Sequence, residues 1–139
     1  MVDAETIVAR LEELDLPRGH WAVHASAVMV LHGLIPSAGD VDVVARGPAW
    51  RRALELGTPA PGKQDLCVSL PELGVEVWSG WMSEDVDALI DGAELVRGVP
   101  CVTLEAVLRF KERAGRPKDE PHARLLRQVL ARDAGAGPR

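Results

Sequence analysis

The chain has 139 residues, of which 47% are hydrophobic and 27% are charged, and a formal net charge of −5. This size and composition are typical of one folded domain and exclude two independent ones. The sequence has no run of about 18 apolar residues, and residues 1–5 are acidic where a secretion signal would be basic, so we expect a cytoplasmic protein without membrane association. The net charge hides an asymmetry, because residues 1–96 hold 6 Lys/Arg against 16 Asp/Glu whereas residues 97–139 hold 10 against 5.

Helical and strand patterns alternate through the first half of the chain. Asp3 is expected to cap the first helix, and residues 17–19, which include a proline and a glycine, break it. Gly33 is expected to close the second helix, and Pro48 suits the first turn of the third. The expected elements are helices ending near Leu14 and spanning residues 25–31 and 49–56, strands over residues 21–24 and 40–45, and loops over residues 34–39 and 58–62.

A hairpin and three helices are predicted in the second half. Two apolar runs separated by residues 71–74 have the spacing of an antiparallel hairpin. Ser83 and Thr103 are expected to cap helices, and Gly115 is expected to end one. The expected elements are strands over residues 66–70 and 75–79, a helix over residues 84–90, an extended segment over residues 94–102, and helices over residues 104–114 and from near Asp119 to about Arg132.

This order of elements predicts an α/β (α+β) fold in which helices pack on a small mixed β-sheet. We expect a single domain over residues 1–133, followed by a disordered tail over residues 134–139. Cys67 and Cys101 both lie in apolar strand-like runs, so both are predicted to be free thiols in the core. No histidine has a Cys or His partner at zinc-ligand spacing, so a zinc site is not expected.

Three acidic residues on predicted strands form the strongest chemical signal. Asp40 and Asp42 are two positions apart on one strand, so their carboxylates project from the same face. Glu76 lies between two valines on a later strand and would join them if the two strands are neighbours. Converging carboxylates require a hard cation such as Mg²⁺ or displaced pKa values. The alternative is that these side chains are solvated at the edge of a sheet.

The turn before the second helix is a candidate anion site. Residues 21–24 are predicted to turn into a helix at Ala25 and Ser26, and small residues at such a turn expose backbone N–H groups and a hydroxyl. These are the groups that hold a phosphate. After the strand that carries Glu76 come Trp78 and Trp81. At least one of the two is expected near the mouth of a cleft, with Trp78 packed in the core.

These motifs together resemble the nucleotidyltransferase superfamily. Residues 23–27 (VHASA), 31–34 (LHGL) and 40–44 (DVDVV) are similar to its hydrophobic strand and Gly-Gly/Ser turn, its Leu-His-Gly helix end and its Asp-x-Asp strand. Lys111 and residues 116–119 (RPKD) are similar to the closing segment of small members, namely minimal nucleotidyltransferases and the nucleotidyltransferase domains of AbiEii-type toxins. The resemblance spans residues 21–130 and implies a single-domain nucleotidyltransferase-like fold.

The resemblance implies a metal-dependent transferase. Asp40, Asp42 and Glu76 would bind one or two Mg²⁺, with Glu76 also able to deprotonate the acceptor. The protein would move a nucleoside monophosphate from an NTP such as ATP to a hydroxyl of a small molecule, RNA or protein. Besides Ala25 and Ser26, the nucleotide-binding residues would be Lys111, Arg116 and Lys118. The alternative for these three basic residues is a solvated helix face with Asp119 as an N-cap.

Two other functions stay open at the sequence level. The family turn usually begins with glycine, and the alanine at this position favours a catalytically degenerate, antitoxin-like binding protein that acts on a protein partner. The basic C-terminal third also suggests RNA binding, but it lacks interleaved aromatic residues, having only Phe110, and the whole chain is acidic. Sequence-specific DNA binding is not expected.

Overall fold

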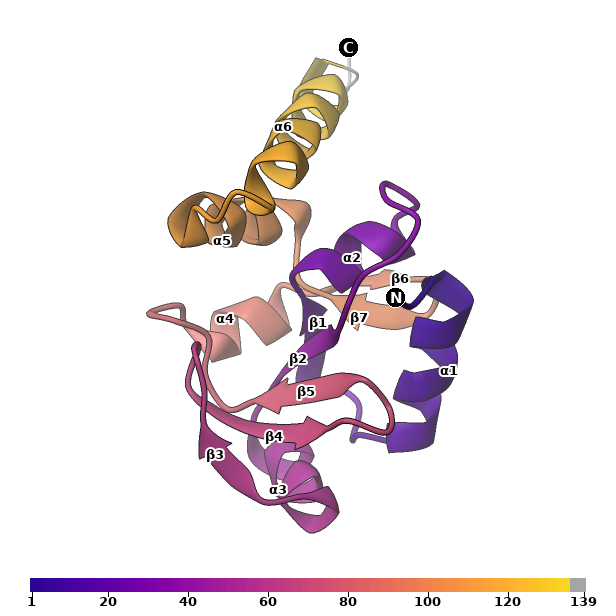
Figure 1. The fold of residues 1–139 in the computed structure, drawn as a ribbon, viewed down its shortest axis with the longest axis vertical. Helices are drawn as coiled ribbons and strands as arrows, with labels where there is room; N and C mark the ends of the chain where they lie inside the picture. The colour runs from indigo at the N-terminus through magenta and orange to yellow at the C-terminus, as the bar shows by residue number, and fades with distance from the viewer. Residues whose placement is uncertain (136–139) are drawn as a thin grey trace.

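A seven-stranded mixed sheet forms the centre of the protein, whose computed structural model describes residues 1–135 (Figure 1). The strand order is β3-β4-β5-β2-β1-β7-β6. The pairs β2–β5 and β1–β7 are parallel, and the other pairs are antiparallel. The strands are β1 (Trp21–His24), β2 (Val41–Ala45), β3 (Pro59–Pro61), β4 (Leu66–Leu70), β5 (Val75–Trp78), β6 (Glu94–Val96) and β7 (Val99–Cys101).

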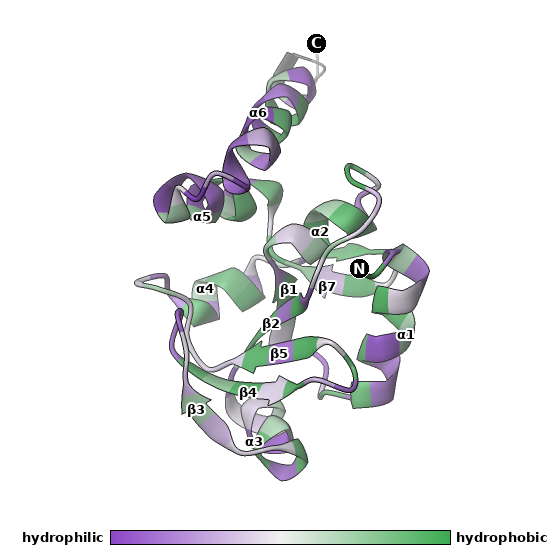
Figure 2. Cartoon of the chain, viewed as in Figure 1, coloured by the Kyte–Doolittle hydropathy of each residue, from purple (hydrophilic) through white to green (hydrophobic). Residues whose placement is uncertain are grey.

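Six helices lie around this sheet in the described part of the chain. They are α1 (Ala4–Leu14), α2 (Ser26–Leu31), α3 (Gly47–Leu56), α4 (Val86–Asp91), α5 (Leu104–Ala114) and α6 (Asp119–Gly135). The α6 helix packs on α5 and projects away from the sheet (Figure 1). Hydrophilic residues predominate on the outer surfaces of these two helices, whereas the central strands are largely hydrophobic (Figure 2). The expected α+β class and single domain are confirmed.

Cap residues explain most of the helix boundaries. Asp3 Oδ1 accepts a hydrogen bond from the Thr6 N–H at 2.9 Å, and Thr103 Oγ1 accepts one from the Ala106 N–H at 3.2 Å, as the sequence predicts. Gly115 ends α5 with a left-handed φ of 58°. The predicted Ser83 cap is wrong, because Asp85 caps α4 instead and its carboxylate accepts from the Ala88 N–H. The short helix therefore begins two residues later than expected.

Two further expectations need correction. The segment predicted as a loop at residues 58–62 contains strand β3, which pairs with β4 at the edge of the sheet. The prolines of this segment argued against a strand, because proline has no N–H to donate to a sheet. At an edge, however, the missing N–H can face away from the partner strand. The α6 helix continues to Gly135, so residues 134 and 135, expected in a disordered tail, are helical. The remaining tail residues, 136–139, lie outside the described part of the chain.

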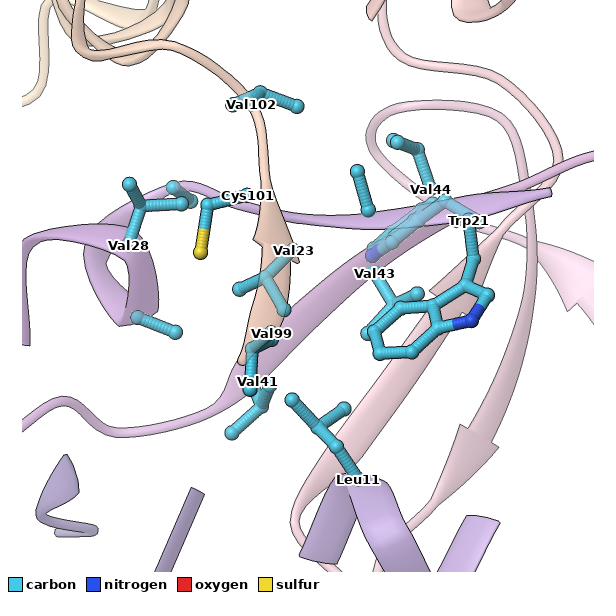
Figure 3. Close-up of a cluster of buried hydrophobic side chains, with 14 of the residues drawn as sticks. Leu11, Trp21, Val23, Val28, Val41, Val43, Val44, Val99, Cys101 and Val102 are labelled. Carbon is cyan, nitrogen blue, oxygen red and sulfur yellow. The ribbon is translucent and has the colours of Figure 1, made fainter. Parts of the chain in front are cut away.

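Two successive rows of side chains on the central strands differ in chemistry. Val23, Val43, Val77 and Val68 are register neighbours across four strands, and each is 0% exposed, so this row forms part of the core. Val23 and Val43 of this row lie within the cluster of buried side chains in Figure 3. The next row lies on the opposite face and is polar, since register neighbours share a face and successive residues alternate. Its members are His24, Asp42, Glu76 and Ser69.

Both cysteines are free and buried, as expected. Burial raises the pKa of each thiol to about 12, so neither is a reactive thiolate at neutral pH. No helix in the described residues combines the length and apolar character needed to cross a bilayer.

Candidate functional site

Asp42 and Glu76 lie side by side in the polar row that crosses the sheet. They are register partners in the parallel pair of β2 and β5, which makes the strands neighbours as the carboxylate hypothesis requires. Asp40 is exposed and lies one residue before β2. The valines between and after the aspartates are fully buried, so the core sets the position of the acidic strand.

Asp42 has the most perturbed carboxyl group of the three. Burial raises its pKa to about 6, and the nearby charges of Glu76 and Asp40 add to the rise. The Trp78 Nε1–H donates a hydrogen bond to Asp42 Oδ1 at 3.0 Å and acts in the opposite direction. Glu76 Oε2 accepts a weak hydrogen bond from the Cys67 thiol, with an S–O distance of 3.6 Å. These carboxylates are therefore crowded and incompletely neutralised by protein groups.

The three carboxylates are chemically suitable ligands for a hard divalent cation, but their arrangement fits such a site only in part. Carboxylate oxygens are the ligands that Mg²⁺ prefers, and a cation would lower the raised pKa of Asp42. However, no three His, Cys, Asp or Glu side chains within residues 1–135 come together as a group that could hold a metal. Asp42 and Glu76 provide the paired core of such a site, and Asp40 would need to turn toward them.

The turn at Ala25 has a backbone that normally requires glycine. Ala25 has φ 60° and ψ −146°, a region in which a Cβ atom is strained. Its N–H donates to Nδ1 of His24 at 2.6 Å, so this amide is not free for a phosphate. Ser26 Oγ accepts a hydrogen bond from Lys111 Nζ at 2.6 Å. The turn therefore has fewer free hydrogen-bonding groups for an anion than the sequence suggested.

The basic residues surround a buried carboxylate. Lys111 is only 3% exposed and forms an ion pair with Asp119, which is 1% exposed, at 3.1 Å. Arg116 Nε donates to Asp119 Oδ2 at 2.6 Å, and the Arg116 guanidinium also lies 5.6 Å from the centre of the Phe110 ring. Lys118 is exposed. A solvated basic face with Asp119 as a simple cap is therefore wrong for Lys111.

A single cleft of about 580 Å³ brings the predicted site residues together. It is bordered by all eight of them: Ala25, Ser26, Asp40, Asp42, Glu76, Lys111, Arg116 and Lys118. The acidic residues come from the sheet, and the basic residues come from α5 and the segment that joins it to α6. A cavity of about 650 Å³ between α1 and the β6–β7 hairpin contains none of these residues.

Two tryptophans and two polar residues complete the border of the cleft. Trp78 and Trp81 both border it, as expected for at least one of them, and both are buried, at 6% and 1% exposure. Trp78 also contacts Asp42 directly, which the sequence did not predict. Gln64 and His122 border it as well, and each has a buried polar side-chain atom without a hydrogen-bond partner in the described structure. Sequence patterns gave no signal for these two, because each is an isolated polar residue in a different segment.

A buried aromatic cluster supports the cleft from beneath. His24 stacks on Trp81 with ring centres 4.3 Å apart, and the Phe110 ring meets Trp81 edge-on at 4.9 Å. Burial lowers the pKa of His24 to about 3, so its imidazole is neutral and Nδ1 is free to accept from Ala25. The histidine therefore connects the cluster to the strained turn.

Comparison of the chain with models of known protein families, with curated proteins and with solved structures finds no match.

Proposed function

We propose that the protein is a small nucleotidyltransferase-like domain that transfers a nucleoside monophosphate from an NTP to a hydroxyl, with Mg²⁺ as cofactor. The observation that carries this proposal is the cleft itself. Paired carboxylates on adjacent parallel strands and cations from α5 and the segment that joins it to α6 border the same space of about 580 Å³. A metal–triphosphate complex requires this combination of an acidic half and a basic half.

Each half of the cleft has a distinct role in the proposed reaction. Asp40, Asp42 and Glu76 would hold Mg²⁺, which supplies charge neutralisation at the α-phosphoryl group and at the leaving pyrophosphate. Glu76 accepts the proton of the acceptor hydroxyl as its oxygen forms a bond to the α-phosphorus. The bond from that phosphorus to the pyrophosphate oxygen breaks. Arg116 and Lys118 orient the triphosphate, so catalysis consists of positioning and charge neutralisation.

The substitution Asp42→Asn tests this function. It removes the buried charge at the centre of the acidic pair, so we expect Mg²⁺-dependent transfer of label from an NTP to an acceptor to fall by at least about 100-fold. The assay incubates the protein with labelled NTPs, Mg²⁺ and hydroxyl acceptors of three kinds: small alcohols, RNA and protein. Glu72→Gln is the matched control, because Glu72 is exposed on the same hairpin as Glu76 and does not border the cleft. Equal activity of wild type and Asp42→Asn would eliminate the catalytic proposal.

Ala25 favours a second candidate, a catalytically degenerate domain that binds a protein partner. Its methyl group and its engaged N–H both reduce what the turn offers a phosphate. Calorimetry with a non-hydrolysable ATP analogue and Mg²⁺ distinguishes the two functions. Mg²⁺-dependent binding that Asp40→Asn abolishes favours the transferase, whereas absence of binding favours the degenerate domain.

A further inference from the structure

Asp119 accepts hydrogen bonds from both main cations of the cleft. Its Oδ1 accepts from Lys111 Nζ and from Arg116 Nη2, each at 3.1 Å. Its Oδ2 accepts from Arg116 Nε at 2.6 Å and from the Arg116 backbone N–H at 3.3 Å. Four donors from two residues thus converge on one carboxylate that is 1% exposed. Asp119 itself does not border the cleft.

The bonds to Asp119 leave donors available to a ligand. A lysine ammonium has three N–H donors, and Lys111 directs one to Asp119 and one to Ser26. A guanidinium has five, and Arg116 directs two to Asp119. Both residues border the cleft, and the Arg116 side chain is 34% exposed. Within residues 1–135, one donor of Lys111 and three of the Arg116 guanidinium therefore have no protein partner.

We propose that Asp119 is a positioning residue that holds Lys111 and Arg116 charged and correctly oriented for a phosphate group in the cleft. This inference rests on the proposed nucleotide function and deepens it by assigning the arrangement of the basic half. Lys111 is 3% exposed, and a buried ammonium without a counter-ion loses its proton or disrupts its surroundings. Burial already lowers the pKa of Lys111, while Asp119 opposes this shift. Removing Asp119 would therefore leave the buried Lys111 ammonium without its counter-ion.

The direction in which Asp119→Asn changes the affinity for an anion tests the proposal. If Asp119 only neutralised the cleft, Asp119→Asn would strengthen the binding of an anion, because a negative charge near the anion is lost. If Asp119 positions the cations, the same substitution weakens binding. Tripolyphosphate without Mg²⁺ is a suitable probe, because it tests the basic half alone. Wild-type protein that binds tripolyphosphate but shows no nucleotidyl transfer would contradict the proposed function. It would not contradict the role of Asp119.

The experiment measures tripolyphosphate binding by calorimetry in wild type, Asp119→Asn and Glu120→Gln. Glu120→Gln removes the same charge at the next residue of α6, where the side chain is 58% exposed and its ion pairs are long, at 3.7 and 3.9 Å. We expect wild type and Glu120→Gln to bind within about twofold of each other. We expect Asp119→Asn to bind about tenfold more weakly or worse, because charge-assisted hydrogen bonds are lost. Unchanged or tighter binding by Asp119→Asn would overturn the proposal, as would wild-type protein that does not bind the probe.

A second variant covers the case in which Asp119→Asn does not fold. Asp119→Glu keeps the charge and the partner of Lys111 but moves the carboxylate by one methylene group. We expect severalfold weaker tripolyphosphate binding and a changed Arg116 Nε–H resonance in the NMR spectrum, because both depend on the geometry of the carboxylate. Wild-type affinity in Asp119→Glu would show that charge alone matters and would overturn the positioning role.

Discussion

Ala25 combines a side chain with a backbone conformation that glycine adopts at little cost. Its φ of 60° with ψ of −146° strains an alanine by about 1–3 kcal/mol. The strain is retained at the border of the candidate site, held by the hydrogen bond from the Ala25 N–H to His24 and by the packing of His24 on Trp81. The sequence showed the departure from glycine, but only the backbone angles show that the position is strained.

The substitution Ala25→Gly is expected to stabilise the protein by about 1 kcal/mol. Relief of the strain exceeds the larger chain entropy of an unfolded glycine, which costs about 0.5–1 kcal/mol. Urea unfolding monitored by tryptophan fluorescence measures this change. Ala27→Gly, in the first turn of α2 at 0% exposure, is the control and should destabilise the protein. A loss of stability in Ala25→Gly would contradict the strain argument.

His24 should make stability depend on pH. Its folded pKa of about 3 lies below the unfolded value of 6.5, so the unfolded state binds one more proton between these values. The free energy of unfolding from this group is fully present above pH 6.5 and falls by about 1.4 kcal/mol per pH unit as the pH decreases toward 3. Urea midpoints between pH 7 and 4 test the slope. His24→Asn keeps an acceptor near the position of Nδ1 but does not titrate, so a slope as steep as that of wild type would exclude His24 as its source.

At the scale of elements, the C-terminal helix α6 is attached to the rest of the molecule mainly through α5. The α6 helix packs mainly on α5 and projects beyond it (Figure 1). Leu126 is 0% exposed within this packing, whereas Leu125 is only partly buried. The two residues are adjacent leucines, so the sequence could not show which of them the partner helix covers completely.

Leu126→Ala should destabilise the protein by about 2–5 kcal/mol, because it opens a cavity between α5 and α6. Leu125→Ala is the matched control at the neighbouring position and should cost clearly less. Chemical denaturation gives both values, and hydrogen exchange along α6 shows whether the helix loosens locally. Equal costs for the two substitutions would contradict the difference in burial.

The strands show which elements can be predicted from local sequence and which cannot. The hairpin of β4 and β5 and the acidic strand β2 follow from alternating residues and turn spacing, and all three are present. Strand β3 was missed because Pro59 and Pro61 argue against a strand unless its edge position is known. Edge position is a property of the assembled sheet, so no local pattern contains it.

At the scale of the whole molecule, the cleft lies where the sheet meets the C-terminal helices. Its acidic residues come from β2, β5 and the residues before β2, and its basic residues come from α5 and the segment after it. The acidic body and the basic C-terminal third of the sequence therefore contribute to the same space. A ligand that contacts both halves would connect the helix pair to the sheet.

Binding of Mg²⁺ and a non-hydrolysable ATP analogue should therefore slow hydrogen exchange in both β2 and α6. At a ligand concentration of about 100 times Kd, linkage adds about 2.7 kcal/mol to the free energy of unfolding. Hydrogen exchange followed by mass spectrometry measures the protection of each element. Protection confined to the sheet would show that the basic half does not contact the ligand, and Asp42→Asn should remove the Mg²⁺-dependent part.

The sequence by itself determined the α+β class and most element boundaries, because these depend on local periodicity and caps. It also supplied eight candidate residues, five from their chemistry and position and the three basic ones from the family resemblance. Only the tertiary structure decided that Asp42 and Glu76 are register partners and that the Ala25 N–H donates to His24. It alone also showed that Asp119 accepts hydrogen bonds from both Lys111 and Arg116. The physical reason is that strand order, burial and ion pairing depend on contacts between residues far apart in the chain. Lys111 and Ser26, 85 positions apart, become hydrogen-bonded only when the helix pair packs against the sheet.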